Sequence, residues 1–381
     1  MVAGDRQRSF LNDMHRARPT SGAAIVPALL LGACSGPATA DPCVTDGVQT
    51  DPPVACAGSN LAVLAQYEFP SERWTAQIGA SHQAIALDAT DVYWSDVGGR
   101  ALRTPKNGGP TEELLPDTGC SITDVAVDDT YVFFGQNCRL DGSGSDFPIR
   151  AKLARMDKLT HRTLDLALTE LAEFRHIVPA GDQVYFTMFT LDEIFLRTVS
   201  RDGPTVSAAA PFGPIVHLQT AHLPFVLSDK DVYYADNSTL RIVDRKDDGT
   251  SIDLATTERF VLALTEVNGT VHWLDEKIQQ SQAVYRLWRA PNGGTAELAI
   301  DGPVVEHMTG DAEAYVGAGD LDLETSITDR VYRWQPSGGR VALAAGLHRP
   351  EGIALDTESV YVTDLTLPDR TVRLKLLKIS R

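Results

Sequence analysis

A phrase of about a dozen residues recurs along this chain: a short apolar run, an acidic or polar turn, and then a valine beside aromatic residues. Clear copies are IALDATDVYWSD at 85–96, FVLSDKDVYYAD at 225–236 and GIALDTESVYVTD at 352–364. The valine position occurs seven times, at spacings of 39 to 52 residues: Val92, Val132, Val184, Val232, Val271, Ala314 and Val360. A period in this range, built from strand-like segments, is typical of a β-propeller.

Each repeat contains four apolar segments separated by turn signals. Asn107-Gly108 and Asp248-Gly249 are examples, and such residues tolerate the positive φ of tight hairpins. The seventh repeat stops after its third segment, which would leave an unpaired sheet edge. The strand-like segment 73–78 precedes the first repeat and can supply the missing strand. The sequence therefore predicts an all-β fold, a seven-bladed β-propeller of four-stranded blades whose last blade is closed by an N-terminal strand.

Two short motifs carry a resemblance to known repeat families. YWSD at 93–96 resembles the YWTD repeat of low-density-lipoprotein-receptor-type propellers, and HRPEGIALD at 348–356 is similar to the opening of NHL and gluconolactonase-like repeats. The resemblance covers nearly all of 74–381 and implies a propeller. It leaves the function open, because these families include receptors, scaffolds, lyases and lactonases.

The N-terminus indicates export. Four arginines precede a short apolar run at 23–31, which is shorter than the roughly 20 residues of a membrane-spanning helix but fits an export signal. The run ends in LGAC at 31–34, which resembles a bacterial lipobox and implies cleavage before Cys34 and its acylation. The alternative is an ordinary cleaved signal in which Cys34 is incidental, and translation from Met14 instead of Met1 would give a shorter signal.

These features predict three regions: a signal peptide at 1–33, a Pro/Ala/Asp-rich tether at 34–72 and the propeller at 73–381. We expect a lipid-anchored protein of the bacterial cell envelope. Ser35 after the cysteine favours the outer membrane by the sorting preference of enterobacterial lipoproteins.

The other cysteines, Cys43, Cys56, Cys120 and Cys138, are an even number, which suggests two disulfides outside the cytoplasm, with three possible pairings. We expect 43–56 and 120–138, because Cys120 and Cys138 fall in connections on the same face of one blade. The net charge of −17 and the absence of a basic cluster exclude a nucleic-acid partner.

Two sets of residues are candidates for chemistry. His82, His176, His222 and His307 fall at or just before the first strand of a repeat, where they could surround the mouth of the channel as catalytic residues or metal ligands. Asp320, Asp322 and Glu324 alternate along GAGDLDLETSITD and could bind Ca²⁺ or another divalent metal. For both sets the alternative is side chains in solvated loops, and no cofactor is firmly expected.

The resulting prediction is a non-catalytic, monomeric lipoprotein. It would present its long connections between second and third strands, at 136–148, 275–282 and 317–329, to an envelope protein, peptide or glycan. A metal-dependent lyase or lactonase-like hydrolase, with the histidines at the channel mouth, is the alternative. A structural envelope protein without a specific ligand is a third interpretation.

Overall fold

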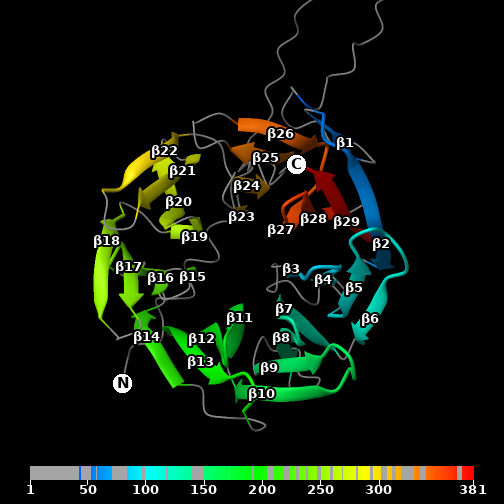
Figure 1. Ribbon diagram of the computed structural model, residues 1–381, viewed down its shortest axis with the longest axis horizontal. Coiled ribbons are helices and arrows are strands. Elements are labelled where there is room, and N and C mark those ends of the chain that lie inside the picture. The colour runs from blue at the N-terminus through cyan, green and yellow to red at the C-terminus, as the bar shows by residue number, and fades with distance from the viewer. Residues whose placement is uncertain are drawn as a thin grey trace, which may run out of the picture. The chain divides into compact units, whose positions relative to one another are not determined.

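Figure 1 shows the computed structural model, which describes Cys43 and, with gaps, residues 53–381. The longer stretches outside the description after residue 53 are 71–83, 140–148, 204–209, 218–223 and 319–329. The chain divides into two compact units, Met1–Thr39 and Ala40–Arg381, and everything below concerns the second. All regular elements among the described residues are strands.

The strands form seven antiparallel sheets arranged as blades in a ring (Figure 1). In each blade the first strand along the repeat, strand A, lies nearest the ring axis, and strands B, C and D follow outward. Blade 1 comprises β3 (Ile85–Leu87), β4 (Asp91–Ser95), β5 (Ala101–Pro105) and β6 (Glu112–Leu115). Blade 2 comprises β7 (Cys120–Val127), β8 (Tyr131–Arg139), β9 (Ile149–Asp157) and β10 (Thr163–Glu170). Blade 3 comprises β11 (Ala172–Ala180), β12 (Gln183–Thr190), β13 (Glu193–Ser200) and β14 (Ala210–His217).

Blades 4 to 7 follow the same order. Blade 4 comprises β15 (Phe225–Leu227), β16 (Asp231–Asp236), β17 (Arg241–Lys246) and β18 (Ser251–Thr256). Blade 5 comprises β19 (Val261–Val267), β20 (Thr270–Gln279), β21 (Gln282–Pro291) and β22 (Glu297–Asp301). Blade 6 comprises β23 (His307–Gly310), β24 (Tyr315–Ala318), β25 (Arg330–Trp334), β26 (Arg340–Ala345) and a fifth strand, β1 (Val54–Ala55). Blade 7 comprises β27 (Pro350–Leu355), β28 (Ser359–Thr366), β29 (Thr371–Ser380) and, as its outer strand, β2 (Leu61–Pro70).

The recurring valine lies in strand B and points toward the preceding blade. Six of its seven positions are described, and all six are buried; Ala314 lies outside the described residues. In blade 1, Val92 and Trp94 pack against Tyr361 of blade 7, and in blade 5, Val271 packs against Ile242 of blade 4. Residues two apart on a strand share a face, so the repeat marks the side on which one blade packs against the next. The predicted seven-bladed propeller is confirmed.

The strand that closes blade 7 is β2 and not the predicted segment 73–78, which lies outside the described residues. β2 pairs antiparallel with β29 from Leu61↔Ile379 to Pro70↔Thr371, and its tyrosine ring lies 5.7 Å from that of Trp94 in blade 1. Closure by an N-terminal strand is therefore confirmed, but the strand comes earlier in the chain, within the stretch expected to be a tether. Within its sequence, LAVLAQYEFP, residues 64, 65, 67 and 69 pack into the hydrophobic cluster shared by blades 7 and 1, whereas Val63 is exposed.

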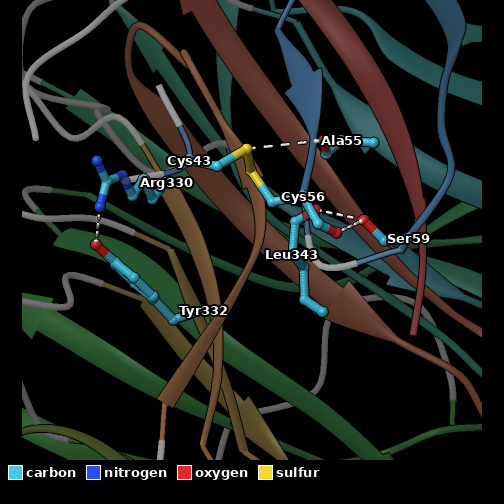
Figure 2. Close-up of a disulfide and its surroundings, with 7 residues drawn as sticks. All are labelled: Cys43, Ala55, Cys56, Ser59, Arg330, Tyr332 and Leu343. Carbon is cyan, nitrogen blue, oxygen red and sulfur yellow. Dashed lines mark hydrogen bonds between the residues drawn. A yellow bond between two sulfur atoms is a disulfide. The ribbon is translucent and has the colours of Figure 1, made fainter. Parts of the chain in front are cut away.

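A second N-terminal strand, β1, was not predicted. It adds to β26 at the outer edge of blade 6, and the N–H of Cys56 continues the pairing by donating to the carbonyl of Leu343 at 2.9 Å. The disulfide between Cys43 and Cys56 lies beside β1, with Cys43 Sγ 3.8 Å from the Ala55 carbonyl oxygen (Figure 2). This disulfide pairing is as predicted.

The second predicted disulfide, Cys120–Cys138, is also present, but not between loops. The two cysteines are directly opposite each other on β7 and β8, with Cα atoms 4.1 Å apart. The bond therefore joins strands A and B of blade 2 at the end where strand B leads into strand C.

Ion pairs join neighbouring blades on the face that carries the A–B turns. In each pair, an aspartate that begins the A–B turn of one blade meets a cation that follows strand C of the next blade. The pairs are Asp356–Lys106 at 2.8 Å, Asp88–Lys158 at 2.7 Å and Asp128–Arg201 at 3.5 Å. They link blades 7, 1, 2 and 3 in sequence, so they reinforce the joint at which the ring closes.

Candidate functional site

On the opposite face, four blades carry a buried aspartate at the end of strand B. These residues stand four positions after the recurring valine: Asp96, Asp236, Asp275 and Asp364. Positions 0, 2 and 4 of a strand share a face, so each carboxylate lies on the side of strand B that meets the preceding blade. We call these four residues the rim aspartates.

Three rim aspartates are bound within their own blade. Asp96 accepts the N–H of Arg100 at 2.9 Å and pairs with its guanidinium. Asp275 receives two hydrogen bonds from the guanidinium of Arg286, at 2.9 and 2.8 Å. Asp236 accepts from the backbone and the hydroxyl of the residue three positions later. A buried carboxylate is tolerated when such donors satisfy it. The contacts of Asp96 and Asp236 hold the start of their B–C connections, whereas the pair of Asp275 and Arg286 lies within the β20–β21 hairpin.

Asp364 differs, because its partners belong to the connection between blades 6 and 7. Its Oδ1 accepts the N–H groups of His348 and Arg349, each at 2.9 Å, while Oδ2 lies 3.9 Å from His348 Nδ1. Lys375, 2% exposed, stands opposite it on β29. Burial raises the pKa of Asp364 despite these donors and positive charges. This aspartate therefore holds the link between two blades.

A second polar group lies on the innermost strands of blades 2 and 3. Asp124 of β7 accepts the N–H of Ile177 in β11 at 2.5 Å and that of Val125 at 2.9 Å. Burial raises the pKa of Asp124 to about 6, although both N–H groups favour the charged form. Such a carboxyl changes its protonation state close to neutral pH, which is the property required of a general acid or base. Sequence reasoning missed Asp124, because no repeat position or motif marks it.

Strand β11 is irregular where Asp124 contacts it. Its register with β12 shifts between Arg175 and Val178, and His176 within this bulge has a φ of 51°. Left-handed backbone is uncommon for residues other than glycine, and bulges often occur near functional sites. His176 is thus the predicted catalytic residue for which the structure shows the most distinctive local geometry.

Most of the other predicted site residues lie outside the described residues. This applies to Cys34, His82, His222, Asp320, Asp322 and Glu324. His307 begins β23, on an innermost strand like His176. Within the described part of the chain, no three His, Cys, Asp or Glu side chains gather in a way that could hold a metal ion. The histidine cluster and the Ca²⁺ site stay predictions.

The B–C connections differ in length between blades, and the one in blade 5 is not a loop as expected. Strands β20 and β21 stay paired as far as Gln279↔Gln282, so the predicted loop 275–282 is the end of a long β-hairpin. In blade 2, β8 continues to Arg139. The remainders of the other two predicted connections, 140–148 and 319–329, lie outside the described residues.

The chain matches no protein-family model, and no curated protein matches it in sequence. Several solved structures have a similar fold. Virginiamycin B lyase from Staphylococcus aureus matches with a TM-score of 0.53 and 12% identity, covering 84% of this chain and 100% of the lyase chain. A streptogramin B lyase matches with a TM-score of 0.51 and 13% identity, covering 85% and 98%. A chain of a mitotic checkpoint complex matches with a TM-score of 0.55 and 10% identity, covering 92% and 98%.

These similarities place the protein in the class of β-propellers. At 10 to 13% identity they concern the fold alone, because one propeller fold supports many unrelated functions. No family model supports the finer resemblance to YWTD or NHL repeats. Among the described residues there is no helix long and apolar enough to cross a bilayer.

Proposed function

We propose that the protein is an envelope-anchored lipoprotein whose propeller binds a protein, peptide or glycan partner, without catalysis, through the face that carries the B–C connections. The observation that carries this proposal is the contrast between the two faces. Three of the seven A–B turns are alike: Asp88, Asp128 and Asp356 each accept two backbone N–H groups of their own turn. The B–C connections vary in length from 191–192 in blade 3 to 319–329 in blade 6.

The rim aspartates explain how this face could bind a partner. They fix strand B toward its B–C end in four blades, so connections of different length start from a rigid frame. A rigid frame with variable connections lowers the conformational entropy lost on binding. The net charge of −17 favours partners that are not themselves strongly acidic.

Anchoring in the envelope rests on the sequence. LGAC at 31–34 supports acylation of Cys34, and two disulfides support an oxidising compartment. Ser35 supports the outer membrane as the destination.

Photo-crosslinking in cells tests the binding face. A photoreactive amino acid is placed in the two long B–C connections, at Ser143 or Leu321, or at the tip of the β20–β21 hairpin, at Gln279. Asp129 and Glu358 in two A–B turns are the matched controls. We expect the B–C positions to give a distinct crosslinked species that the controls lack. The purified partner should then bind the wild-type chain and bind less tightly when 278–283 or another crosslinking connection is shortened. Equal crosslinking from both faces, or none from the three B–C positions, would contradict the proposal.

A second candidate is a metal-dependent lyase or lactonase-like hydrolase at the inner end of the blades. The left-handed backbone of His176, next to the Ile177 N–H that binds Asp124, favours it. The test is the metal content of the purified protein after dialysis without chelator. A stoichiometric divalent ion that is lost in a His176→Ala variant would support this function, and a metal-free chain would exclude its metal-dependent form.

A further inference from the structure

The segment that precedes β2 crosses from blade 6 to blade 7 at their outer edges. Ser59 Oγ donates to the carbonyl of Leu343 in blade 6 at 2.5 Å. The N–H of Ser380 in blade 7 donates to the carbonyl of Asn60 at 2.8 Å, and Ser380 Oγ accepts the N–H of Asn60 at 2.6 Å. From β1 onward, the N-terminal segment is therefore held on the propeller by backbone hydrogen bonds.

The Cys43–Cys56 disulfide extends this attachment toward the N-terminus. Cys56 is buried between β1 and β2 and bonded to blade 6 through its own N–H. Figure 2 shows the disulfide beside β1, so Cys43 is held at the outer edge of blade 6. The bond moves the last fixed point of the chain from Val54 back to Cys43.

We propose that this disulfide is a latch that sets the exit point and the length of the membrane tether, so that the outer edge of blades 6 and 7 faces the lipid bilayer. The inference rests on the proposed acylation of Cys34. With the latch closed, the eight residues 35–42 lie between Cys34 and Cys43, a reach of roughly 30 Å when fully extended. Without it, the nineteen residues 35–53 lie between Cys34 and Val54, and the reach rises to roughly 70 Å.

The outer strand of blade 7 supports this orientation independently. It lies next to the exit point, exposes Ala62 and Val63, and has no charged residue between positions 61 and 67. The one carboxylate of β2, Glu68, forms an ion pair with Arg373 of β29 at 2.7 Å. Envelope bilayers contain anionic lipids, which repel acidic surfaces. In a chain of net charge −17, an edge whose one carboxylate is paired with a cation is compatible with a nearby bilayer.

Energy transfer to the membrane tests the proposal. The acylated full-length chain carries one fluorescent non-canonical amino acid, either at Ala62 in blade 7 or at Asp182 in blade 3, across the ring. It is bound to vesicles that contain an acceptor lipid. We expect stronger transfer from Ala62 than from Asp182, and a smaller difference in the Cys43→Ser, Cys56→Ser double variant. Equal transfer from the two positions of the wild type, or an unchanged difference in the double variant, would overturn the proposal.

Two controls separate the latch from the anchor. The Cys120→Ser, Cys138→Ser variant loses a disulfide inside blade 2 and should keep the wild-type difference. If mass spectrometry shows no acyl chain on Cys34, the proposed anchoring fails, and the latch is tested without a membrane by energy transfer between Ala40 and Ala62. That transfer should fall when Cys43 and Cys56 are replaced by serine, and unchanged transfer would overturn the latch itself.

Discussion

Replacing Asp124 by asparagine should make the stability of the propeller less dependent on pH. Burial raises the pKa of Asp124 from 3.8 to about 6 in the folded chain. A carboxyl with a higher pKa in the folded state binds its proton more tightly there. Its stabilising contribution is therefore complete below the unfolded pKa and is lost as the pH rises through about 6. Asparagine stays neutral at every pH and keeps an oxygen that can accept the N–H of Ile177.

The size of the effect follows from the two pKa values. A difference of about two pKa units corresponds to about 3 kcal/mol, at about 1.4 kcal/mol per unit. Asp124 is partly exposed, so solvent screening makes this an upper limit. We expect the variant to be about as stable as the wild type near pH 4 and about 1–3 kcal/mol more stable near pH 7.5. Urea unfolding at a series of pH values measures this difference.

The matched control is Asp129→Asn, in the exposed A–B turn of the same blade. It should change the free energy of unfolding little at any pH. If Asp124→Asn shifts the free energy of unfolding by the same amount at pH 4.5 and at pH 7.5, burial does not govern the titration of Asp124, and the reasoning is refuted.

Three further substitutions test the joints between and within blades. Although burial opposes it, Lys158 and nearby N–H groups hold the pKa of Asp88 well below its usual range, so Asp88 of the wild type is still charged at pH 3. Lys158→Met should therefore cost about 1–2 kcal/mol at pH 7 and nearly as much at pH 3, and a loss that has disappeared by pH 3 in urea unfolding would contradict this. At Gly135 a Cβ would lie 2.6 Å from a threonine hydroxyl of β7 and 2.9 Å from a carbonyl of β11. Gly135→Ala should therefore lower the free energy of unfolding by about 1–3 kcal/mol. An unchanged thermal midpoint would show that the blades are not in close contact there. The Cys120–Cys138 bond closes a loop with a sequence separation of 18. Replacing both cysteines by serine should therefore lower the free energy of unfolding, measured by chemical denaturation, by about 3 kcal/mol. An unchanged free energy of unfolding would mean that the unfolded chain gains little conformational freedom without the bond.

The number and order of the blades could be predicted from sequence because every repeat must bury the same strand. Val92 and its counterparts lie between two neighbouring blades, where only an apolar side chain fits, so the repeat stays visible even where aromatic and turn residues vary. The disulfide partners were predictable for a similar reason. Each pair is close in sequence, and Cys120 and Cys138 lie at the same end of adjacent strands.

The closing strand and the inner polar group could not be predicted in this way. β2 belongs to no repeat, and its ten residues pair with a partner about 300 positions away, as in Leu61↔Ile379, so no local pattern defines its register. Asp124 has no counterpart in the other repeats. Burial between the inner strands raises its pKa, and its contact with the Ile177 N–H lies at a bulge in β11 that leaves no signal in a single sequence.

The rim aspartates show where repeat-based reasoning stops. All four occupy the same repeat position and are buried at the same end of strand B, so the repeat predicts their place. Their partners differ: a guanidinium four residues later for Asp96, one across the hairpin for Asp275, and backbone N–H groups of the inter-blade connection for Asp364. Each partner is set by the length and course of the neighbouring connection, which is the part of the fold that varies. The same variation that makes the partners unpredictable gives the B–C face its distinct surface in each blade, and this is why we assign the binding function to that face.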